Sequence, residues 1–110
     1  KGKNDREIKQ LINDAELLEK NGVFAIVLEC VKTPIAKKIT QNLNIPTIGI
    51  GSSVYCDGQV LVTDDLLGLN ETKIKFVKKF LNLKKYINLG LKKYASEVRL
   101  KKYPLKKHSY

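Results

Sequence analysis

A single carboxylate, Glu29, lies near the end of the most apolar stretch of the chain, residues 24–31, which read Phe-Ala-Ile-Val-Leu-Glu-Cys-Val. Such a run of apolar and β-branched residues is typical of a strand covered on both faces in a parallel sheet. Parallel α/β folds gather their chemistry at the carboxyl ends of the strands. Glu29 is therefore a candidate catalytic acid or base, and the alternative is a plain ion pair with a neighbouring lysine.

Two adjacent carboxylates, Asp64 and Asp65, follow another apolar run, residues 59–62. Neighbouring carboxylates at the end of a parallel strand can bind a divalent cation. The alternative, which we favour, is that one of them caps the next turn while the other faces solvent.

A glycine-rich segment offers a weaker candidate site. Gly49 and Gly51, followed by Ser52 and Ser53, resemble a backbone cradle for an anion, although two glycines at this spacing also simply permit close packing. His108 is the only histidine, and it lies in a polar tail without a partner nearby in the sequence. No Ser-His-Asp set, P-loop or zinc spacing is present in the sequence.

The length and charge of the chain limit its function. Its 110 residues suffice for one small domain. The net charge of +10 raises nucleic acid as a partner, but of the 21 basic residues only Arg6 and Arg99 are arginine. Nucleic-acid readers use arginine for bidentate contacts and aromatic residues for stacking. We interpret the lysine excess as the bias of an AT-rich genome, and we expect no nucleic-acid partner.

The two cysteines, Cys30 and Cys56, have neither metal-binding nor redox spacing. Two reduced thiols are typical of a cytoplasmic protein. No apolar run approaches the ~18 residues of a transmembrane helix, and no signal peptide is recognisable. We therefore expect a cytoplasmic location without membrane contact.

Alternating helices and strands would position these residues. A helix is predicted from the cap Asn4, with Glu7 three residues later, to residues 21–22, Asn-Gly. A second helix is predicted to begin at Thr33, as cap, with proline following it, and a second strand covers residues 47–51. The apolar members of the two helices are Ile8, Leu11, Ile12, Ala15 and Leu18, then Ile35, Ala36, Ile39 and Leu43. The order α-β-α-β predicts a parallel sheet with right-handed crossovers.

The rest of the chain is less regular. Only residues 52–58 separate the second strand from the third, so a hairpin with Asp57-Gly58 in its turn competes with a parallel arrangement. A helix is then predicted from residues 70–72 onward, and another over about residues 86–101, ended by Pro104. Their apolar members are Ile74, Val77, Phe80 and Leu81, then Leu89, Leu91, Tyr94, Ala95 and Val98.

Several blocks of the sequence together resemble one known family. They are residues 24–31, residues 45–51 (Ile-Pro-Thr-Ile-Gly-Ile-Gly), residues 56–62 (Cys-Asp-Gly-Gln-Val-Leu-Val), residues 65–68 (Asp-Leu-Leu-Gly), and the ending Tyr103-Pro104 with His108-Ser109-Tyr110. In order and spacing they resemble ketopantoate hydroxymethyltransferase, over essentially the whole chain.

The resemblance implies an α/β fold, the C-terminal part of a (β/α)8 TIM barrel. Such barrels need ~250 residues, so we expect residues 1–110 to be one partial domain whose N-terminal half is absent. The three strands would be the sixth, seventh and eighth of the barrel. The family's seventh connection is short, which favours the parallel arrangement of the third strand.

The resemblance also implies the chemistry. The family transfers a hydroxymethyl group from methylene-tetrahydrofolate to 3-methyl-2-oxobutanoate, giving ketopantoate for pantothenate biosynthesis. Its general base is the glutamate that corresponds to Glu29. Its Mg2+ polarises the keto acid, and the metal ligands are expected in the missing half, so no metal ligand is assigned here. The partners implied are the keto acid, the N-terminal half of the barrel and further copies in a homo-oligomer.

Some positions depart from the family pattern. The family commonly has His-Asp where this chain has Asp64-Asp65, Ala-Gly at Ser52-Ser53, and proline at Lys32. We expect the chain alone to be inactive and poorly stable, because three strands cannot close a barrel. A non-catalytic remnant or assembly subunit is the alternative, and a basic nucleic-acid-binding module is a more distant one.

Overall fold

The computed structural model describes residues 1–71 and 73–110. The chain forms two compact units, the first comprising residues 1–62 and 73–77 and the second comprising residues 63–72 and 78–110. No helix within the described residues is long and apolar enough to cross a membrane.

The first unit opens with helix α1 (Asp5–Lys20), as its capping residues predict. The side chain of Asn4 accepts a hydrogen bond from the backbone N–H of Glu7 at 2.9 Å. The Glu7 carboxylate accepts in turn from the N–H of Lys3 at 2.7 Å, rather than from the N–H of the cap residue itself. The helix ends before Gly22, whose φ of 83° is the left-handed conformation that closes helices.

Three strands form one parallel sheet in the order β1-β2-β3, namely β1 (Ile26–Glu29), β2 (Thr47–Ile50) and β3 (Gly58–Gln59). The third strand is therefore parallel to the second, and a hairpin at Asp57-Gly58 is excluded. It is also shorter and earlier than the apolar run at residues 59–62, because pairing with β2 is limited to two residues.

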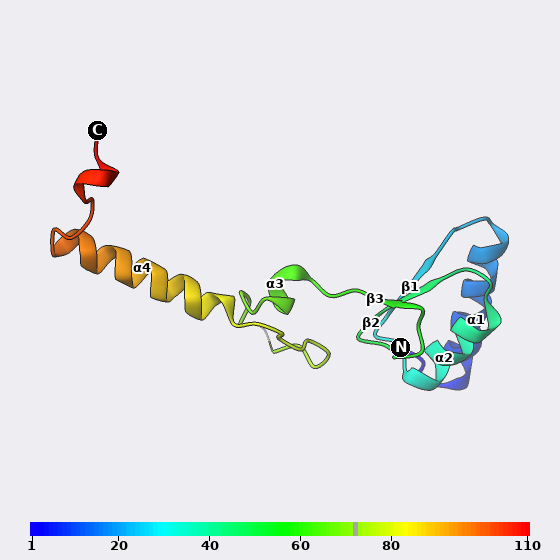
Figure 1. Cartoon of the computed structure of the whole chain (residues 1–110). Coiled ribbons are helices and arrows are strands. Elements are labelled where there is room, and N and C mark those ends of the chain that lie inside the picture. The colour runs from blue at the N-terminus through cyan, green and yellow to red at the C-terminus, as the bar shows by residue number, and fades with distance from the viewer. Residues whose placement is uncertain (72) are drawn as a thin grey trace. The chain divides into compact units, whose positions relative to one another are not determined.

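The core lies on one face of this sheet, where α1 and helix α2 (Thr33–Asn42) pack (Figure 1). Ile26 and Leu28 of β1 are buried there, and the largest fully buried apolar side chain is Ile39 of α2. Within the first unit the prediction of a strand covered on both faces is not met, since Val27 of β1 is 60% exposed. Side chains alternate along a strand, and α1 and α2 pack against the face that carries Ile26 and Leu28.

Helix α2 begins at Thr33, but Thr33 does not cap it. The cap position is Lys32, with no capping hydrogen bond from its side chain, and the Thr33 hydroxyl donates to the carbonyl oxygen of Ser52 at 3.3 Å. The predicted apolar face is largely confirmed, since Ile35, Ala36 and Ile39 are buried in the core.

The carboxylate of Asp57 ties the start of β2 to the loop before β3. Its Oδ2 accepts hydrogen bonds from the backbone N–H of Thr47 at 2.8 Å and from the Thr47 hydroxyl at 3.1 Å. The Thr47 hydroxyl also lies 2.8 Å from that of Thr40 in α2. The two bonds from Thr47, led by its backbone N–H, hold the pKa of Asp57 below its ordinary value of 3.8.

Because the pKa of Asp57 is lowered on folding, its contribution to stability is present above pH 3.8 and is lost as the pH falls through the lower folded value. We expect Asp57→Asn to lower the free energy of unfolding near neutral pH. At a pH below the lowered pKa of Asp57, the variant and the unmodified chain should have the same free energy of unfolding. Far-ultraviolet circular dichroism during urea unfolding at a series of pH values would measure the difference. The control is Asp14→Asn, which changes an exposed carboxylate on α1. An equal pH-dependent loss of unfolding free energy in this variant would contradict the stabilising role of Asp57.

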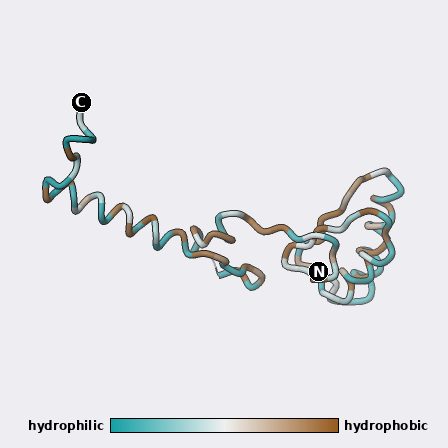
Figure 2. The backbone as a smooth tube through the Cα atoms, in the orientation of Figure 1, coloured by the Kyte–Doolittle hydropathy of each residue, from teal (hydrophilic) through white to brown (hydrophobic). Residues whose placement is uncertain are grey.

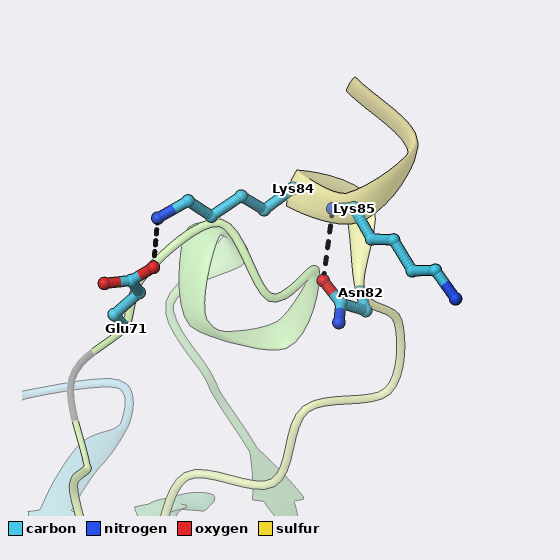
Figure 3. A network of polar contacts seen from close by, with 4 residues as sticks. All are labelled: Glu71, Asn82, Lys84 and Lys85. Carbon is cyan, nitrogen blue, oxygen red and sulfur yellow. Dashed lines mark hydrogen bonds and ion pairs between the residues drawn. The ribbon is translucent and has the colours of Figure 1, made fainter. Parts of the chain in front are cut away.

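The second unit contains the short helix α3 (Thr63–Leu66) and the long helix α4 (Leu83–Arg99). Asn82 caps α4, its side-chain oxygen accepting from the N–H of Lys85 at 3.2 Å (Figure 3). Lys84 forms an ion pair with Glu71, which lowers the pKa of this carboxylate. Both side chains are exposed, so the pair adds little to stability.

The helix predicted from residues 70–72 onward is not formed, and Thr72 lies outside the described residues. Residues 73–77 fold with the first unit, whereas residues 78–82 fold with the second. The N–H of Phe80 donates to the carbonyl oxygen of Leu66 at 2.9 Å, and that of Leu83 donates to Leu67 at 2.8 Å. These bonds to the α3 region replace the intrahelical bonds that the apolar spacing predicted.

Helix α4 confirms the prediction for residues 86–101, although it begins three residues earlier and ends at Arg99. Apolar and polar residues alternate along it (Figure 2). None of its side chains is buried within the described residues. Beyond it, Tyr103 packs edge-on against Tyr94, with ring centroids 5.6 Å apart.

Candidate functional site

Glu29 is the last residue of β1, at the carboxyl end of the parallel sheet. Its neighbour in register on β2 is Ile50, and Val27 lies two residues before it on the same face. This face is opposite to the one that α1 and α2 cover, and the Glu29 side chain is exposed. The described residues provide no ion pair to Glu29, so a plain ion pair with a neighbouring lysine is not observed in this part of the chain.

A sharp backbone turn directly follows Glu29. Cys30 has a φ of 53°, in the left-handed region that residues other than glycine rarely adopt. Its N–H still donates to the carbonyl oxygen of Ile50 at 3.0 Å, so the sheet pairing is held up to the turn. Backbone strain of this kind concentrates at functional sites. The turn ends the strand at Glu29 and starts the connection to α2.

A pocket of about 880 Å³ opens at the same ends of β1 and β2. It is lined by Cys30, Val31, Lys32, Thr33, Pro34, Gly51, Ser52, Ser53, Val54, Gln59, Lys75 and Phe76. These residues all belong to the first unit, and they come from residues 30–34, from residues 51–59 and from residues 75–76. Glu29 does not line the pocket but directly precedes Cys30, which does.

The glycine-rich segment serves packing as well as lining the pocket. A Cβ atom at Gly49 would lie 2.9 Å from the side-chain amide of Gln59, and one at Gly51 would lie 2.5 Å from the ring of Phe76. Gly51 also has a φ of 57°, so it meets both a conformational and a steric requirement for glycine. The Ser52 hydroxyl donates to the carbonyl oxygen of Val31 at 3.0 Å. Close packing, the alternative to an anion cradle, is therefore observed.

Asp64 and Asp65 belong to the second unit, at the start of α3. The side chain of Asp64 is exposed, in agreement with the favoured alternative. Asp65 is buried and accepts a hydrogen bond from the side-chain amide of Asn70 at 2.9 Å, so it holds the turn after α3. His108, also in this unit, accepts a bond from the N–H of Leu105 through Nδ1 at 3.3 Å and lies beside Tyr103.

Residues 1–71 and 73–110 contain no group of three or more His, Cys, Asp or Glu side chains that could hold a metal ion. We assign none of these residues to the Mg2+ that the family resemblance implies.

The pocket includes residues that the sequence analysis did not associate with a site. Lys75 and Phe76 were expected in a helix, and the irregular segment that carries them packs against Gly51 instead. Gln59 was expected only as the first residue of a strand, yet its amide donates to the carbonyl oxygen of Ser53 at 2.7 Å. No local spacing marks these residues, because each reaches the pocket through a contact between distant segments.

Residues 1–106 match the family model described as ketopantoate hydroxymethyltransferase. Curated relatives named 3-methyl-2-oxobutanoate hydroxymethyltransferase match almost the whole chain. The protein from Pelagibacter ubique is 56% identical over 110 residues, covering 100% of this chain and 43% of the relative. Those from Kosmotoga olearia and Saccharolobus solfataricus are 54% and 50% identical, covering 94% and 97% of the chain and 39% and 40% of the relatives. The chain thus spans about two fifths of the length of the relatives it matches.

Proposed function

The chain belongs to the ketopantoate hydroxymethyltransferase family, and from this membership we propose that it supplies the general base for hydroxymethyl transfer to 3-methyl-2-oxobutanoate. The observation that carries the proposal is the position of Glu29. It ends a parallel strand beside a strained turn and a pocket, on the face of the sheet opposite to the one that α1 and α2 cover.

The fold that accompanies this proposal is a (β/α)8 barrel to which β1, β2 and β3 contribute three consecutive strands. The parallel order and the one-sided core support it, because barrel strands carry helices outside and packed side chains inside. Val27, Ile50 and Glu29 would then face the interior, with Glu29 at the carboxyl end where barrel active sites lie. The rest of the barrel would come from sequence that the relatives have and this chain does not match.

In the proposed reaction, the Glu29 carboxylate takes the proton from C3 of 3-methyl-2-oxobutanoate. The electron pair of the broken C–H bond delocalises onto the neighbouring ketone as an enolate. Water and methylene-tetrahydrofolate give formaldehyde and tetrahydrofolate, and both C–N bonds of the methylene carbon are broken in this step. The enolate carbon then adds to the carbonyl carbon of formaldehyde, whose oxygen takes up a proton and becomes the hydroxyl group of ketopantoate. A positioned carboxylate suits the first step, since proton transfer by an oriented side chain is an efficient form of catalysis.

The proposal can be tested with a hybrid protein in which these 110 residues replace the matched region of the Pelagibacter ubique relative. We expect the hybrid, with Mg2+, to exchange deuterium at C3 of 3-methyl-2-oxobutanoate by NMR and to form ketopantoate from methylene-tetrahydrofolate. A hybrid that is folded, as judged by circular dichroism, but shows neither reaction would contradict the proposal. That outcome would favour the non-catalytic alternative.

A further inference from the structure

The left-handed turn at Cys30 determines where β1 ends and therefore where the Glu29 side chain begins. Cys30 has a φ of 53°, and a residue with a Cβ atom keeps this conformation only where surrounding contacts hold it. Relaxation of this φ would rotate the peptide group between Glu29 and Cys30. The N–H of that group donates to the carbonyl oxygen of Ile50 at 3.0 Å and joins the end of β1 to β2. The position of Glu29 therefore depends on the contacts that hold the turn.

Two side-chain hydroxyls join the connection after Cys30 to the loop between β2 and β3. The Ser52 hydroxyl donates to the carbonyl oxygen of Val31 at 3.0 Å. In return, the Thr33 hydroxyl donates to the carbonyl oxygen of Ser52 at 3.3 Å. The backbone is thus held on both sides of the strained residue, on its N-terminal side by the bond to Ile50 and on its C-terminal side by the bond from Ser52.

The loop that carries Ser52 is itself fixed on both sides of this residue. The ring of Phe76 packs against Gly51, and the carbonyl oxygen of Ser53 accepts a hydrogen bond from the side-chain amide of Gln59 at 2.7 Å. Ser53 is buried, as is the residue whose carbonyl oxygen accepts from Ser52. A hydrogen bond between segments that are already ordered costs little further conformational entropy. The Ser52 hydroxyl can therefore hold the turn effectively.

We propose that Ser52 is a positioning residue for Glu29. By binding the carbonyl oxygen of Val31, its hydroxyl holds Cys30 in the left-handed conformation and so keeps the Glu29 carboxylate aimed at C3 of the keto acid. The inference rests on the function proposed above, and Ser52 acts through the backbone rather than on the substrate. A general base is efficient only where it is oriented toward the proton that it removes. Since the family commonly has alanine at this position, the restraint is particular to this chain, and its loss should slow the reaction rather than stop it.

The inference can be tested with Ser52→Ala in the hybrid protein, by NMR measurement of deuterium exchange at C3 of 3-methyl-2-oxobutanoate below the unfolding transition. We expect kcat to fall about three- to tenfold, the factor that the loss of one hydrogen bond allows. KM for the keto acid should change little, because the bond orients the base and does not bind the substrate. Ser52→Thr, which keeps the hydroxyl, should recover most of the lost rate.

Thr40→Val is the matched control. The Thr40 hydroxyl also donates to a backbone carbonyl, that of Ala36 at 2.9 Å, but it lies beside Thr47 at the opposite end of the sheet from the turn. Its loss should lower stability without changing kcat. Amide hydrogen exchange, followed by mass spectrometry, gives a measurement that is independent of activity. The peptide containing residues 29–31 should exchange faster in Ser52→Ala but not in Thr40→Val, because the first substitution releases the turn.

Three outcomes would overturn the inference. They are an unchanged kcat in Ser52→Ala, an equal fall of kcat in Thr40→Val, and a fall of kcat in Ser52→Ala without faster amide exchange at the turn. Glu29→Gln distinguishes these failures from that of the proposed function. If Glu29→Gln stops deuterium exchange at C3 and Ser52→Ala does not slow it, the inference alone fails. If Glu29→Gln keeps full exchange at C3, the proposed function fails, and faster amide exchange in Ser52→Ala would still show that Ser52 holds the turn.

Discussion

Glu29→Gln in the hybrid protein is expected to slow deuterium exchange at C3 of 3-methyl-2-oxobutanoate by about 10²- to 10⁴-fold, the usual contribution of a general base. Glutamine preserves the size of the side chain but cannot accept the proton. Glu29 is not a member of the core cluster that α1 and α2 form with β1, so the substitution removes no contact of that core. We therefore expect the thermal unfolding temperature of the hybrid to change little while the exchange rate falls steeply.

Glu16→Gln makes the same chemical change on α1 and is the matched control, with no loss of exchange expected. Glu29→Asp adds a second measurement, since it keeps the carboxylate but withdraws it from the keto acid by one methylene group. Its exchange rate should lie between those of the unmodified protein and Glu29→Gln. Full exchange by Glu29→Gln in a folded hybrid would remove Glu29 from the mechanism.

Ile39→Ala is expected to have the largest effect on stability. Ile39 is 1% exposed and packs in the cluster between α2 and the covered face of the sheet. Truncating a buried isoleucine to alanine removes apolar contacts and leaves a cavity, at a cost of about 2–5 kcal/mol. In a protein the size of the hybrid this corresponds to a fall of roughly 4–20 °C in Tm, measured by circular dichroism.

The matched control is Leu17→Ala on α1, which removes a side chain of the same size at a position that is 60% exposed. Its Tm should fall by much less, because little apolar surface leaves a packed environment. Equal falls for the two variants would mean that the cluster around Ile39 is not the core of the first unit. Neither substitution touches Glu29 or the pocket lining, so exchange at a temperature below both transitions should be retained.

Local sequence patterns were sufficient to predict α1, β1, α2 and β2 of the first unit. Asn4 with Glu7, and Gly22 after Asn21, marked both ends of α1, because caps depend only on neighbouring residues. The α-β-α-β order likewise predicted the parallel pairing of β1 and β2. Glu29 was located at the end of its strand from the apolar run alone, although its catalytic role remains a proposal.

Local sequence patterns gave wrong predictions where contacts between distant segments determine the structure. Apolar spacing predicted a helix from residues 70–72 onward, but the backbone N–H of Phe80 donates to Leu66 and the ring of Phe76 packs on Gly51. The continuous apolar run of β1 likewise indicated burial on both faces, whereas Val27 is exposed. The hydrophobicity of a side chain indicates that it favours burial. It does not indicate which element of the structure covers that side chain.

Residue types and their spacing were enough to predict the family and the order of helices and strands in the first unit, and the family resemblance then singled out Glu29 as the candidate base. Local patterns left open whether β3 forms a hairpin with β2, and the structure confirms the parallel arrangement that the family resemblance favoured, with the Asp57 carboxylate bonded to Thr47. The tertiary structure also brought Lys75 to the same pocket as Lys32. These features arise from contacts between residues far apart in the chain, which a local pattern does not encode.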